Sequence, residues 1–416
     1  MSRNNPKRQN QSEPLRSGTP DYGIWGASLI HPDARLQMDY AMRLPISVAG
    51  ALMPGAHVGY GLPVGGVLAT DNAVIPYAVG VDIACRMRLT IFPESPIVLG
   101  QQPGRFKKAL MEQTRFGAGS KWDAYEQVEH AVLEDDAWTQ QTLLRSLKDT
   151  AFKQLGTSGS GNHFVEWGAL ELDSDDADTG LRAGRYLALL SHSGSRGVGF
   201  RITNHFSELA RSQHPDLDPA VRHMAWFTLT SGDGQDYWQA MELAGRFAAA
   251  NHEVIHQRLT RAAGLKPLLT VENHHNFAWK MMIPVQVRFA APAREVIVHR
   301  KGATPAGDGV LGIVPGSMGA PGYLVRGRGN AKALNSAAHG AGRAMSRREA
   351  MGSITRRDRD QMLLEQGITL LGGGVDEAPQ AYKSIEQVMQ AQKDLVSVVA
   401  RFHPKIVRMA DERGPT

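Results

Sequence analysis

The chain has 416 residues, of which 42% are hydrophobic and 21% are charged, and it contains one cysteine. This composition excludes a disordered or fibrous protein and allows a large buried core. The formal net charge of +5 favours polyanionic partners only weakly. No apolar run reaches the length of a membrane span, and the N-terminus has no apolar signal core. These features predict a cytoplasmic protein that does not bind membranes.

Residues 1–20 are polar and contain prolines, which predicts a disordered arm before one catalytic domain over residues 21–416. Residues 47–80, rich in glycine, alanine and valine, predict short buried strands joined by glycine turns. Residues 102–150 have the apolar spacing of helices. The apolar run 186–190 predicts a buried strand with His192 at its end.

A helix is expected from Asp233, as the N-cap, to about Leu259. Its buried stripe is formed by Tyr237, Met241, Ala244, Ala248, Ile255 and Leu259. Strands are expected at 295–299 and 310–314, and a last helix at Ser384, with Gln387 completing a capping box. Because helices and strands alternate without a regular βαβ rhythm, the sequence predicts a mixed α+β fold.

The only cysteine, Cys85, lies three residues after Asp82 in Gly-Val-Asp-Ile-Ala-Cys-Arg-Met. A lone cysteine is usually a small buried hydrophobe. Later segments rich in glycine, serine and asparagine, however, carry the histidines His163, His192, His274 and His275. Adjacent side chains on an extended backbone point in opposite directions, so one of the pair 274–275 is expected to be a ligand. Imidazole, carboxylate and a thiolate that can bridge two ions together predict a site for Mn, Fe, Co or Zn.

Two further segments predict phosphate chemistry. The small residues after His192 let backbone N–H groups approach an anion, and Arg196 adds a planar guanidinium. His339 precedes Gly-Ala-Gly-Arg343, where an imidazole could act as a covalent nucleophile and form a phosphoramidate. The alternative for this second segment, a glycine-rich turn before a basic helix face, is equally compatible with its residues.

Eight motifs in order, over about residues 45–408, resemble the successive signatures of the RtcB RNA ligases. They are GVDIACRM, LGTSGSGNHFVE, LSHSGSRGVGF, HHNF, HRKGAT, IVPGSMGAPGYLVRG, NSAAHGAGRAMSRR and DEAPQAYKSIEQVM. The resemblance implies a single catalytic domain with mixed β-sheets flanked by helices around a dinuclear metal site. It also implies two Mn²⁺ ions, GTP, and RNA with a 3′-phosphate or 2′,3′-cyclic phosphate that is joined to a 5′-hydroxyl end, in RNA repair or tRNA splicing.

The same resemblance implies the role of each site residue. The guanylylated nucleophile would be His339, and the metal ligands would be Asp82, Cys85, His163, His192 and His275, with the thiolate shared between two ions. Nucleotide contacts would come from Asn162, Phe164, Glu166, Arg196, Ser317, Arg343, Tyr382 and, at the position of a family lysine that reaches guanine, Arg408. No feature of the sequence identifies an activating protein partner.

The chain departs from the family pattern at four positions. Ala84 and Arg86 replace glycines, Gly55 replaces an aspartate, and Arg408 replaces the lysine. Arg86 either binds a phosphate beside the metals or points to solvent or a local carboxylate. A metal-dependent phosphoesterase, or an RNA-end-binding protein that has lost sealing, remains the alternative function. The retained His339 favours the ligase, because a hydrolase needs no guanylyl acceptor.

Overall fold

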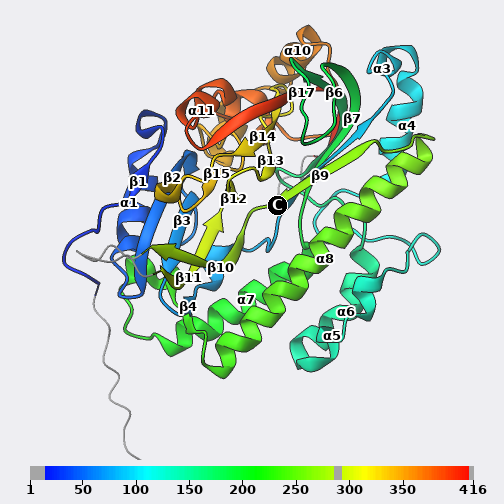
Figure 1. Cartoon of the computed structure of the whole chain (residues 1–416). Coiled ribbons are helices and arrows are strands. Elements are labelled where there is room, and N and C mark those ends of the chain that lie inside the picture. The colour runs from blue at the N-terminus through cyan, green and yellow to red at the C-terminus, as the bar shows by residue number, and fades with distance from the viewer. Residues whose placement is uncertain (1–14, 285–292, 412–416) are drawn as a thin grey trace, which may run out of the picture.

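The computed structural model describes residues 15–284 and 293–411. Two β-sheets lie side by side, and helices cover them from below and from the right in the view of Figure 1. One sheet has five strands in the order β1-β2-β3-β11-β10, and the other has the order β13-β14-β17-β6-β7-β5-β9, with β16 beside β17. Most strand pairs are antiparallel, and β1–β2 and β16–β17 are parallel. The mixed α+β fold predicted from the sequence is therefore confirmed.

The strands have the following bounds. The five-stranded sheet contains β1 (Gly23–Ile24), β2 (Ser47–His57), β3 (Val64–Thr70), β10 (Phe277–Pro284) and β11 (Ala293–Lys301). The larger sheet contains β5 (Arg86–Phe92), β6 (Phe164–Leu172), β7 (Gly184–Ser193), β9 (Leu269–His274), β13 (Leu311–Val314), β14 (Gly322–Gly327), β16 (Thr369–Leu371) and β17 (Val396–Met409). Two small pairs are β4 (Ala73–Val74) with β8 (Phe227–Thr228), and β12 (Ala303–Pro305) with β15 (Ser336–Ala338).

The helices follow in chain order. They are α1 (Pro32–Met42), α2 (Pro76–Val79), α3 (Val98–Gln101), α4 (Pro103–Gln113), α5 (Ala137–Gln140), α6 (Thr142–Gln154), α7 (Arg196–Gln213), α8 (Gly232–Ala262), α9 (Arg347–Ser353), α10 (Arg356–Glu365) and α11 (Ile385–Ala391). A 3₁₀ helix, η3 (Pro219–Met224), packs against α1 and α2. No helix among residues 15–284 and 293–411 is long and apolar enough to cross a membrane.

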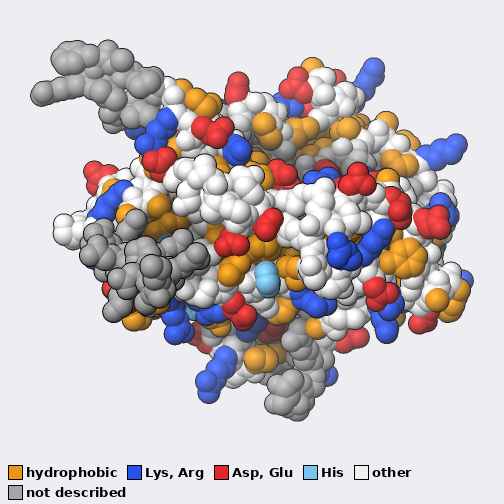
Figure 2. Space-filling model, turned by 90° about the horizontal axis from the view of Figure 1, so that it is seen from below, with side chains coloured by type: hydrophobic (Ala, Val, Ile, Leu, Met, Phe, Trp, Pro, Cys, Tyr) orange, Lys and Arg blue, Asp and Glu red, His pale blue; other side chains and the backbone are white. Residues whose placement is uncertain are grey.

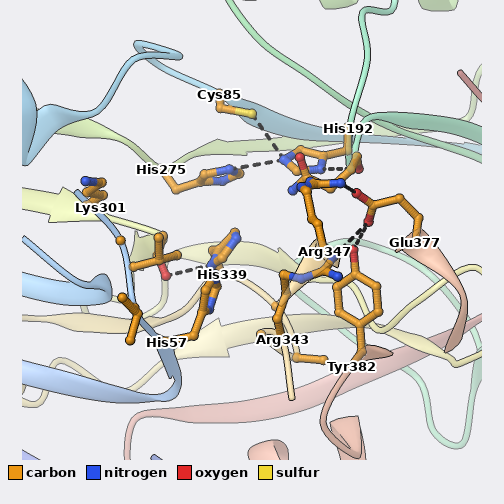
Figure 3. Close-up of a pocket in the computed structure, with 18 of the residues that line it drawn as sticks. His57, Cys85, His192, His275, Lys301, His339, Arg343, Arg347, Glu377 and Tyr382 are labelled. Carbon is orange, nitrogen blue, oxygen red and sulfur yellow. Dashed lines mark hydrogen bonds and ion pairs between the residues drawn. The ribbon is translucent and has the colours of Figure 1, made fainter. Parts of the chain in front are cut away.

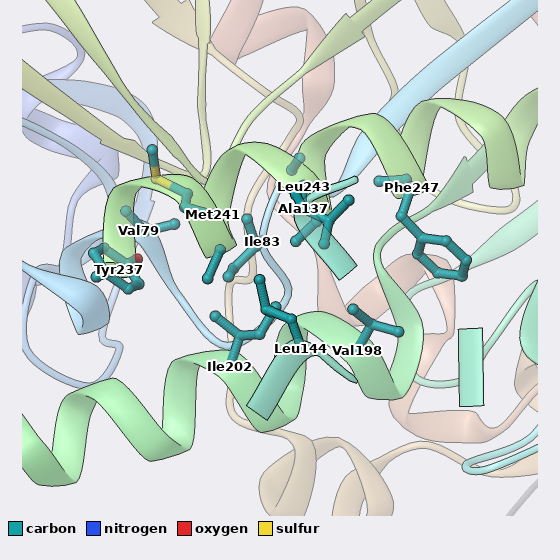
Figure 4. Packing of buried hydrophobic residues seen from close by; sticks show 14 of the residues in the cluster. Val79, Ile83, Ala137, Leu144, Val198, Ile202, Tyr237, Met241, Leu243 and Phe247 are labelled. Atoms are coloured by element: carbon teal, nitrogen blue, oxygen red, sulfur yellow. The ribbon is translucent and has the colours of Figure 1, made fainter. Parts of the chain in front are cut away.

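Helix α8 organises the largest part of the core. Its predicted apolar stripe is buried, and Tyr237 and Met241 pack with residues of α6 and α7 (Figure 4). Ile83, from the loop that joins Asp82 to Cys85, is fully buried in this same cluster. Burying an isoleucine side chain contributes roughly 1.5–3 kcal/mol. Packing of the core therefore holds the loop that carries the predicted metal ligands.

Several local expectations were wrong in detail. Ser231, and not Asp233, caps α8, because its hydroxyl accepts the Gly234 N–H at 3.0 Å. Asp233 lies in the first turn, where a carboxylate favours the helix dipole. The helical spacing of 102–150 corresponds to α4, α5 and α6 together with the irregular segment 114–130. At the last helix Ser384 is the N-cap, as expected, and accepts the Gln387 N–H at 3.3 Å.

The expected arm lies mostly outside the described residues, which begin at Leu15. Its Arg16 donates a hydrogen bond to the Pro45 carbonyl at 2.8 Å, so the last part of the arm lies against the body of the protein. On the face shown in Figure 2, basic and acidic side chains are interspersed. On that face, positively charged side chains therefore have acidic side chains as neighbours.

Candidate metal centre and nucleophile pocket

The ends of four neighbouring strands meet at one edge of the larger sheet. In the β5–β7 pair Met87 lies opposite His192, and in the β6–β7 pair Phe164 lies opposite His192. The β5–β9 register places Arg86 opposite His274, and the His275 N–H donates to the Cys85 carbonyl at 2.9 Å. Antiparallel pairing thus brings together segments that lie up to 190 residues apart in the chain.

Five side chains form a continuous chain of close contacts at this edge, and Figure 3 shows three of them, Cys85, His192 and His275. Cys85 Sγ lies between two imidazoles, 3.3 Å from His163 Nε2 and 3.1 Å from His192 Nε2. Beyond them, Asp82 Oδ2 lies 3.0 Å from His163 Nε2, and His275 Nε2 lies 3.2 Å from His192 Nε2. The thiol therefore separates an Asp–His pair from a His–His pair, which is the arrangement that a bridging sulfur requires.

The electrostatics of the imidazoles fit a bound cation, whereas the Cys85 thiol would need the charge of that cation to lose its proton. Burial and the Asp82 carboxylate raise the pKa of the Cys85 thiol well above its usual value. Burial lowers the pKa of His192 and His275 well below the ordinary histidine value, so both imidazoles are neutral. The ligand atoms of Cys85, His163 and His192 all lie within 4.8 Å of one another. A metal ion favours a thiolate and neutral imidazoles, so this cluster can hold one.

The neighbouring groups orient the ligands. His192 Nδ1 lies 3.1 Å from the Asn162 carbonyl, which can only accept, so Nδ1 carries the proton and Nε2 presents its lone pair to the cluster. Burial alone would raise the pKa of Asp82, but its hydrogen bond with His163 and the charge of Arg196 lower it to about 2. The Ser195 N–H holds Asp82 Oδ1 at 3.0 Å.

His339 lies next to this cluster, with its ring centroid 4.6 Å from that of His275. Its Nδ1 lies 2.6 Å from the Gly302 carbonyl oxygen, so Nδ1 is the donor and Nε2 carries the lone pair. Burial lowers the pKa of His339 to about 4, which leaves the imidazole neutral at pH 7. A neutral ring held by one nitrogen, with the other nitrogen free, is the form that an attacking nucleophile needs.

A cavity of about 830 Å³ contains both His339 and the metal cluster. Its opposite wall is polar and comes from the C-terminal third of the chain (Figure 3). There Tyr382 and Arg347 both donate to Glu377, and the Arg343 guanidinium lies 5.3 Å from the Tyr382 ring centroid. Arg343 Nη1 is buried and lies 3.5 Å from Glu377 Oε2 in an ion pair, without a hydrogen bond of good geometry within the described residues. The cations and Glu377 therefore form one charged wall of the cavity.

The predicted nucleotide contacts divide into three groups. Asn162, Phe164, Ser317, Arg343 and Tyr382 line the cavity. Glu166 and Arg196 lie behind its lining: Glu166 is buried on the same face of β6 as Phe164, and Arg196 Nη1 lies 3.1 Å from His163 Nδ1. The third group is Arg408 alone.

The structure does not bring Arg408 into the cavity. Its neighbour Met409 lines the cavity, and alternation along β17 turns the Arg408 side chain to the other face of the sheet. There its Nε donates to Thr114 Oγ1 at 3.1 Å, and its guanidinium lies 5.7 Å from the Phe116 ring centroid. This arrangement does not support a contact between Arg408 and guanine, which stays a prediction.

Comparison with known proteins places this geometry in a family. The family model described as tRNA-splicing ligase RtcB matches residues 37–410. The chain belongs to the RtcB family. It is 32% identical over 404 residues to the RNA-splicing ligase RtcB of Escherichia coli (strain K12), covering 89% of this chain and 92% of that protein. The RNA-splicing ligase RtcB of Mycobacterium tuberculosis (strain H37Rv) is 30% identical, covering 86% and 95%, and the tRNA-splicing ligase RtcB of Archaeoglobus fulgidus is 29% identical, covering 90% and 91%.

Two departures from the RtcB pattern, Ala84 and Arg86, lie in or next to the loop that joins Asp82 to Cys85. The Arg86 side chain is buried, and its Nη1 forms an ion pair with Glu272 Oε1, on an exposed side chain, at 3.1 Å. The local-carboxylate alternative is therefore correct, and the phosphate alternative is not supported. Ala84 has a φ of 53°, a left-handed conformation in which glycine is unstrained and alanine is not.

Gly55, at the RtcB aspartate position, packs directly on the segment after His339. A Cβ atom added to Gly55 would lie 2.6 Å from the Gly340 carbonyl oxygen. Conversely, a Cβ added to Gly342, which has a φ of 72°, would lie 1.9 Å from the Gly55 carbonyl oxygen. Backbone occupies the space that a carboxylate would need, so the segment 340–342 approaches β2 closely in this member of the family.

The sequence interpretation missed three groups that line the pocket, His57, Lys301 and Glu377. Lys301 is 8% exposed, and burial lowers its pKa to about 7. Burial likewise lowers the pKa of His57 to about 4. Lys301 is the last residue of β11, whose middle is apolar. A charged residue at the end of a buried strand is the sequence signal that could have identified this lysine as a site residue.

A second pair of histidines has the sequence spacing of a metal motif, but in the structure both are held by hydrogen bonds. Residues 252–256 read His-Glu-Val-Ile-His, the spacing of a zinc-peptidase helix. In the structure both imidazoles contact Ser191 Oγ at 2.8 Å, through His252 Nδ1 and His256 Nε2. These histidines form a buried hydrogen-bonded layer behind β7, and that geometry leaves no common point for a metal.

Proposed function

We propose that the protein is a GTP- and Mn²⁺-dependent RNA ligase that acts in RNA repair or tRNA splicing. It joins an RNA 3′-phosphate, or a 2′,3′-cyclic phosphate, to a 5′-hydroxyl end. The observation that carries the proposal is the neutral His339 imidazole, with its Nε2 free, beside a cluster that can hold metal in one cavity. Membership of the RtcB family supports the same reaction.

The chemistry begins at His339 Nε2, which attacks the α-phosphorus of GTP and expels pyrophosphate. The Gly302 carbonyl, 2.6 Å from Nδ1, orients the ring and stabilises the positive charge that develops on it. The GMP group then passes to the RNA 3′-phosphate and frees the histidine. Attack by the RNA 5′-hydroxyl on the activated phosphate forms the phosphodiester and releases GMP.

The metal ligands in this proposal are Asp82, Cys85, His163, His192 and His275. These residues would hold two Mn²⁺ ions, and bound Mn²⁺ would neutralise phosphate charge and so lower the barrier to displacement. Arg343 adds a fixed guanidinium on the opposite wall, where its Nη1, now 3.5 Å from Glu377 Oε2, would turn to a phosphate in competition with that carboxylate.

The guanine base is proposed to lie near Phe164 and Tyr382, which line the cavity. Glu166 is buried on the same strand face as Phe164, and burial raises its pKa well above the ordinary value. No described residue donates a hydrogen bond to its carboxyl group. Guanine offers two N–H groups to such an acceptor, so the base would compensate the cost of burying it.

The test is covalent labelling. The protein is incubated with Mn²⁺ and GTP labelled at the α-phosphate, and the protein-bound label is tested for acid lability. We expect an acid-labile label on the wild type, none on His339→Ala, and equal metal content in both. His403→Ala, at a half-buried histidine outside the cavity, is the matched control and should be labelled like the wild type. Labelling of His339→Ala at the wild-type level would refute the proposal, and release of 3′-phosphate without labelling would favour the phosphoesterase.

A further inference from the structure

The mouth of the cavity carries a cluster of three aromatic rings. Tyr60 lines the cavity, yet its side chain is 73% exposed. Tyr77, on α2, lines the same cavity. The ring of His223, from η3, lies 5.9 Å from that of Tyr60 and 5.1 Å from that of Tyr77, measured between centroids. We call Tyr60, Tyr77 and His223 the aromatic cluster.

The backbone around Tyr60 is held on both sides, while the ring of Tyr60 is open to solvent. On one side, the Gly59 N–H donates to Gln37 Oε1 at 3.0 Å, and the Gln37 amide donates back to the Gly59 carbonyl. On the other side, Gly61 packs on η3, where a Cβ would lie 3.3 Å from the His223 carbonyl oxygen. Lys301 Nζ donates to the carbonyl of Tyr60 itself. An exposed ring on a fixed backbone is preorganised for a ligand.

The aromatic cluster lies close to the reaction centre. Tyr77 precedes the predicted metal ligand Asp82 by five residues, a stretch of chain that spans at most about 18 Å. Lys301 lies against the stretch of chain that joins Tyr77 to Asp82, because its Cε is 3.8 Å from the Cβ position of Gly80. A strand that enters the cavity with its end at the metal cluster therefore passes the cluster of rings within its first nucleotides.

The charges around the rings match a nucleic acid. Burial lowers the pKa of His223, and the positive charges of Arg222, Arg211 and Lys301 lower it further. Arg222 and Arg211 thus supply two permanent positive charges near the ring that joins the two tyrosines, and Lys301, with a pKa of about 7, supplies a partial one. Single-stranded RNA is bound by this combination, in which aromatic faces stack with bases and cations contact phosphates.

We propose that the aromatic cluster is a stacking platform for an unpaired nucleobase next to the RNA end that is to be joined. Tyr60 stacks directly on the base, while Tyr77 and His223 support it from the side of the cavity. Since every base has a π-face, the platform accepts any base and selects single-stranded ends. This inference rests on the proposed function, because it assigns part of the RNA path to the same cavity.

The first test compares RNA affinities. A fluorescent single-stranded RNA with a 3′-phosphate, and a second one with a 5′-hydroxyl, are titrated at one fixed salt concentration with wild type, Tyr60→Ala and Tyr60→Phe. Stacking predicts that Tyr60→Ala weakens binding of one of these RNAs by roughly 5- to 150-fold. Tyr60→Phe, which keeps the ring, should bind like the wild type. Tyr125→Ala removes a tyrosine that is 86% exposed and lies outside the cavity, so it should also bind like the wild type.

The second test identifies stacking itself. Abasic residues are placed singly at the first, second and third nucleotides from the RNA end. In the wild type, one abasic position should reproduce the loss seen with Tyr60→Ala, and in Tyr60→Ala the same abasic change should cost nothing more. The RNA in which this coupling occurs shows whether the 3′-phosphate or the 5′-hydroxyl strand crosses the platform.

Equal affinities of wild type and Tyr60→Ala for both RNAs would overturn the platform, and so would a loss that is additive with every abasic change. Failure of the wild type to bind either RNA would also overturn it. Covalent labelling of the wild type by GTP is measured in parallel. If the wild type is labelled but Tyr60→Ala has the same RNA affinity, the platform alone is rejected. If the wild type is not labelled, the proposed ligase activity is rejected.

Discussion

Restoring the aspartate of the RtcB pattern at Gly55 should damage the site. The new Cβ would begin 2.6 Å from the Gly340 carbonyl oxygen, whereas ordinary contacts begin at 3.4 Å, so β2 and the segment after His339 would have to separate by about 0.8 Å. Gly342 packs on the Gly55 carbonyl, so a second close contact in the same segment would have to adjust as well.

The expected size of the effect follows from these contacts. Overpacking of this kind costs typically about 1–3 kcal/mol in the free energy of unfolding. The carboxylate would also meet carbonyl oxygens, which repel it. A displacement of about 1 Å at a reacting group lowers a rate by roughly a hundredfold, so guanylylation of His339 should slow by about that factor.

The assay is the single-turnover rate of covalent labelling by GTP, together with urea unfolding. Gly55→Ala introduces the same Cβ without the charge and separates the steric part from the electrostatic part. Gly104→Asp makes the same exchange where no atom lies within 4 Å of the added Cβ, so it should leave both measurements unchanged. Labelling of Gly55→Asp at or above the wild-type rate would show that the segment after His339 can yield and that the reasoning is wrong.

Three further predictions concern neighbouring groups. Cys85→Ala should lose bound metal and guanylylation together, by more than the 10–100-fold typical of residues that only support ligands, and full occupancy in a metal analysis would exclude a bridging thiolate. Arg86→Gly should lower the free energy of unfolding by roughly 1–3 kcal/mol, because a buried side chain is removed while the exposed Glu272 keeps its ion pair with Arg88; calorimetry should find GTP affinity unchanged, and weaker GTP binding would restore the phosphate alternative. Burial lowers the folded-state pKa of Lys301 from 10.5 to about 7, so the unfolded chain binds more protons between these values, and stability should rise with pH across that window. Lys301→Met should flatten this rise in urea unfolding at about pH 6.5 and about pH 9, and an unchanged slope would argue against a buried, depressed lysine.

Much of the local structure was determined by the sequence alone. The apolar stripe of α8 and the run 186–190 within β7 could be predicted because burial of one face imposes a period that a short window records. The grouping of Asp82, Cys85 and the histidines could also be proposed, because few side chains offer such ligand chemistry and each lies in a segment rich in small residues. Ser384 was found as an N-cap for the same local reason.

Only the tertiary structure decided where individual side chains point. His275 joins the metal cluster, whereas His274 packs with its centroid 5.1 Å from the rings of Phe277 and Trp279. Arg86 reaches Glu272, and Arg408 lies on the far face of β17. Each outcome depends on strand register, and a shift of one residue exchanges the two faces of a strand. Register is set by pairing between segments that lie far apart in the chain, such as those of Val165 and Arg408, so no window of the sequence contains it. The close approach of Gly55 to Gly340 has the same origin, because it joins two backbone segments that lie far apart in the chain.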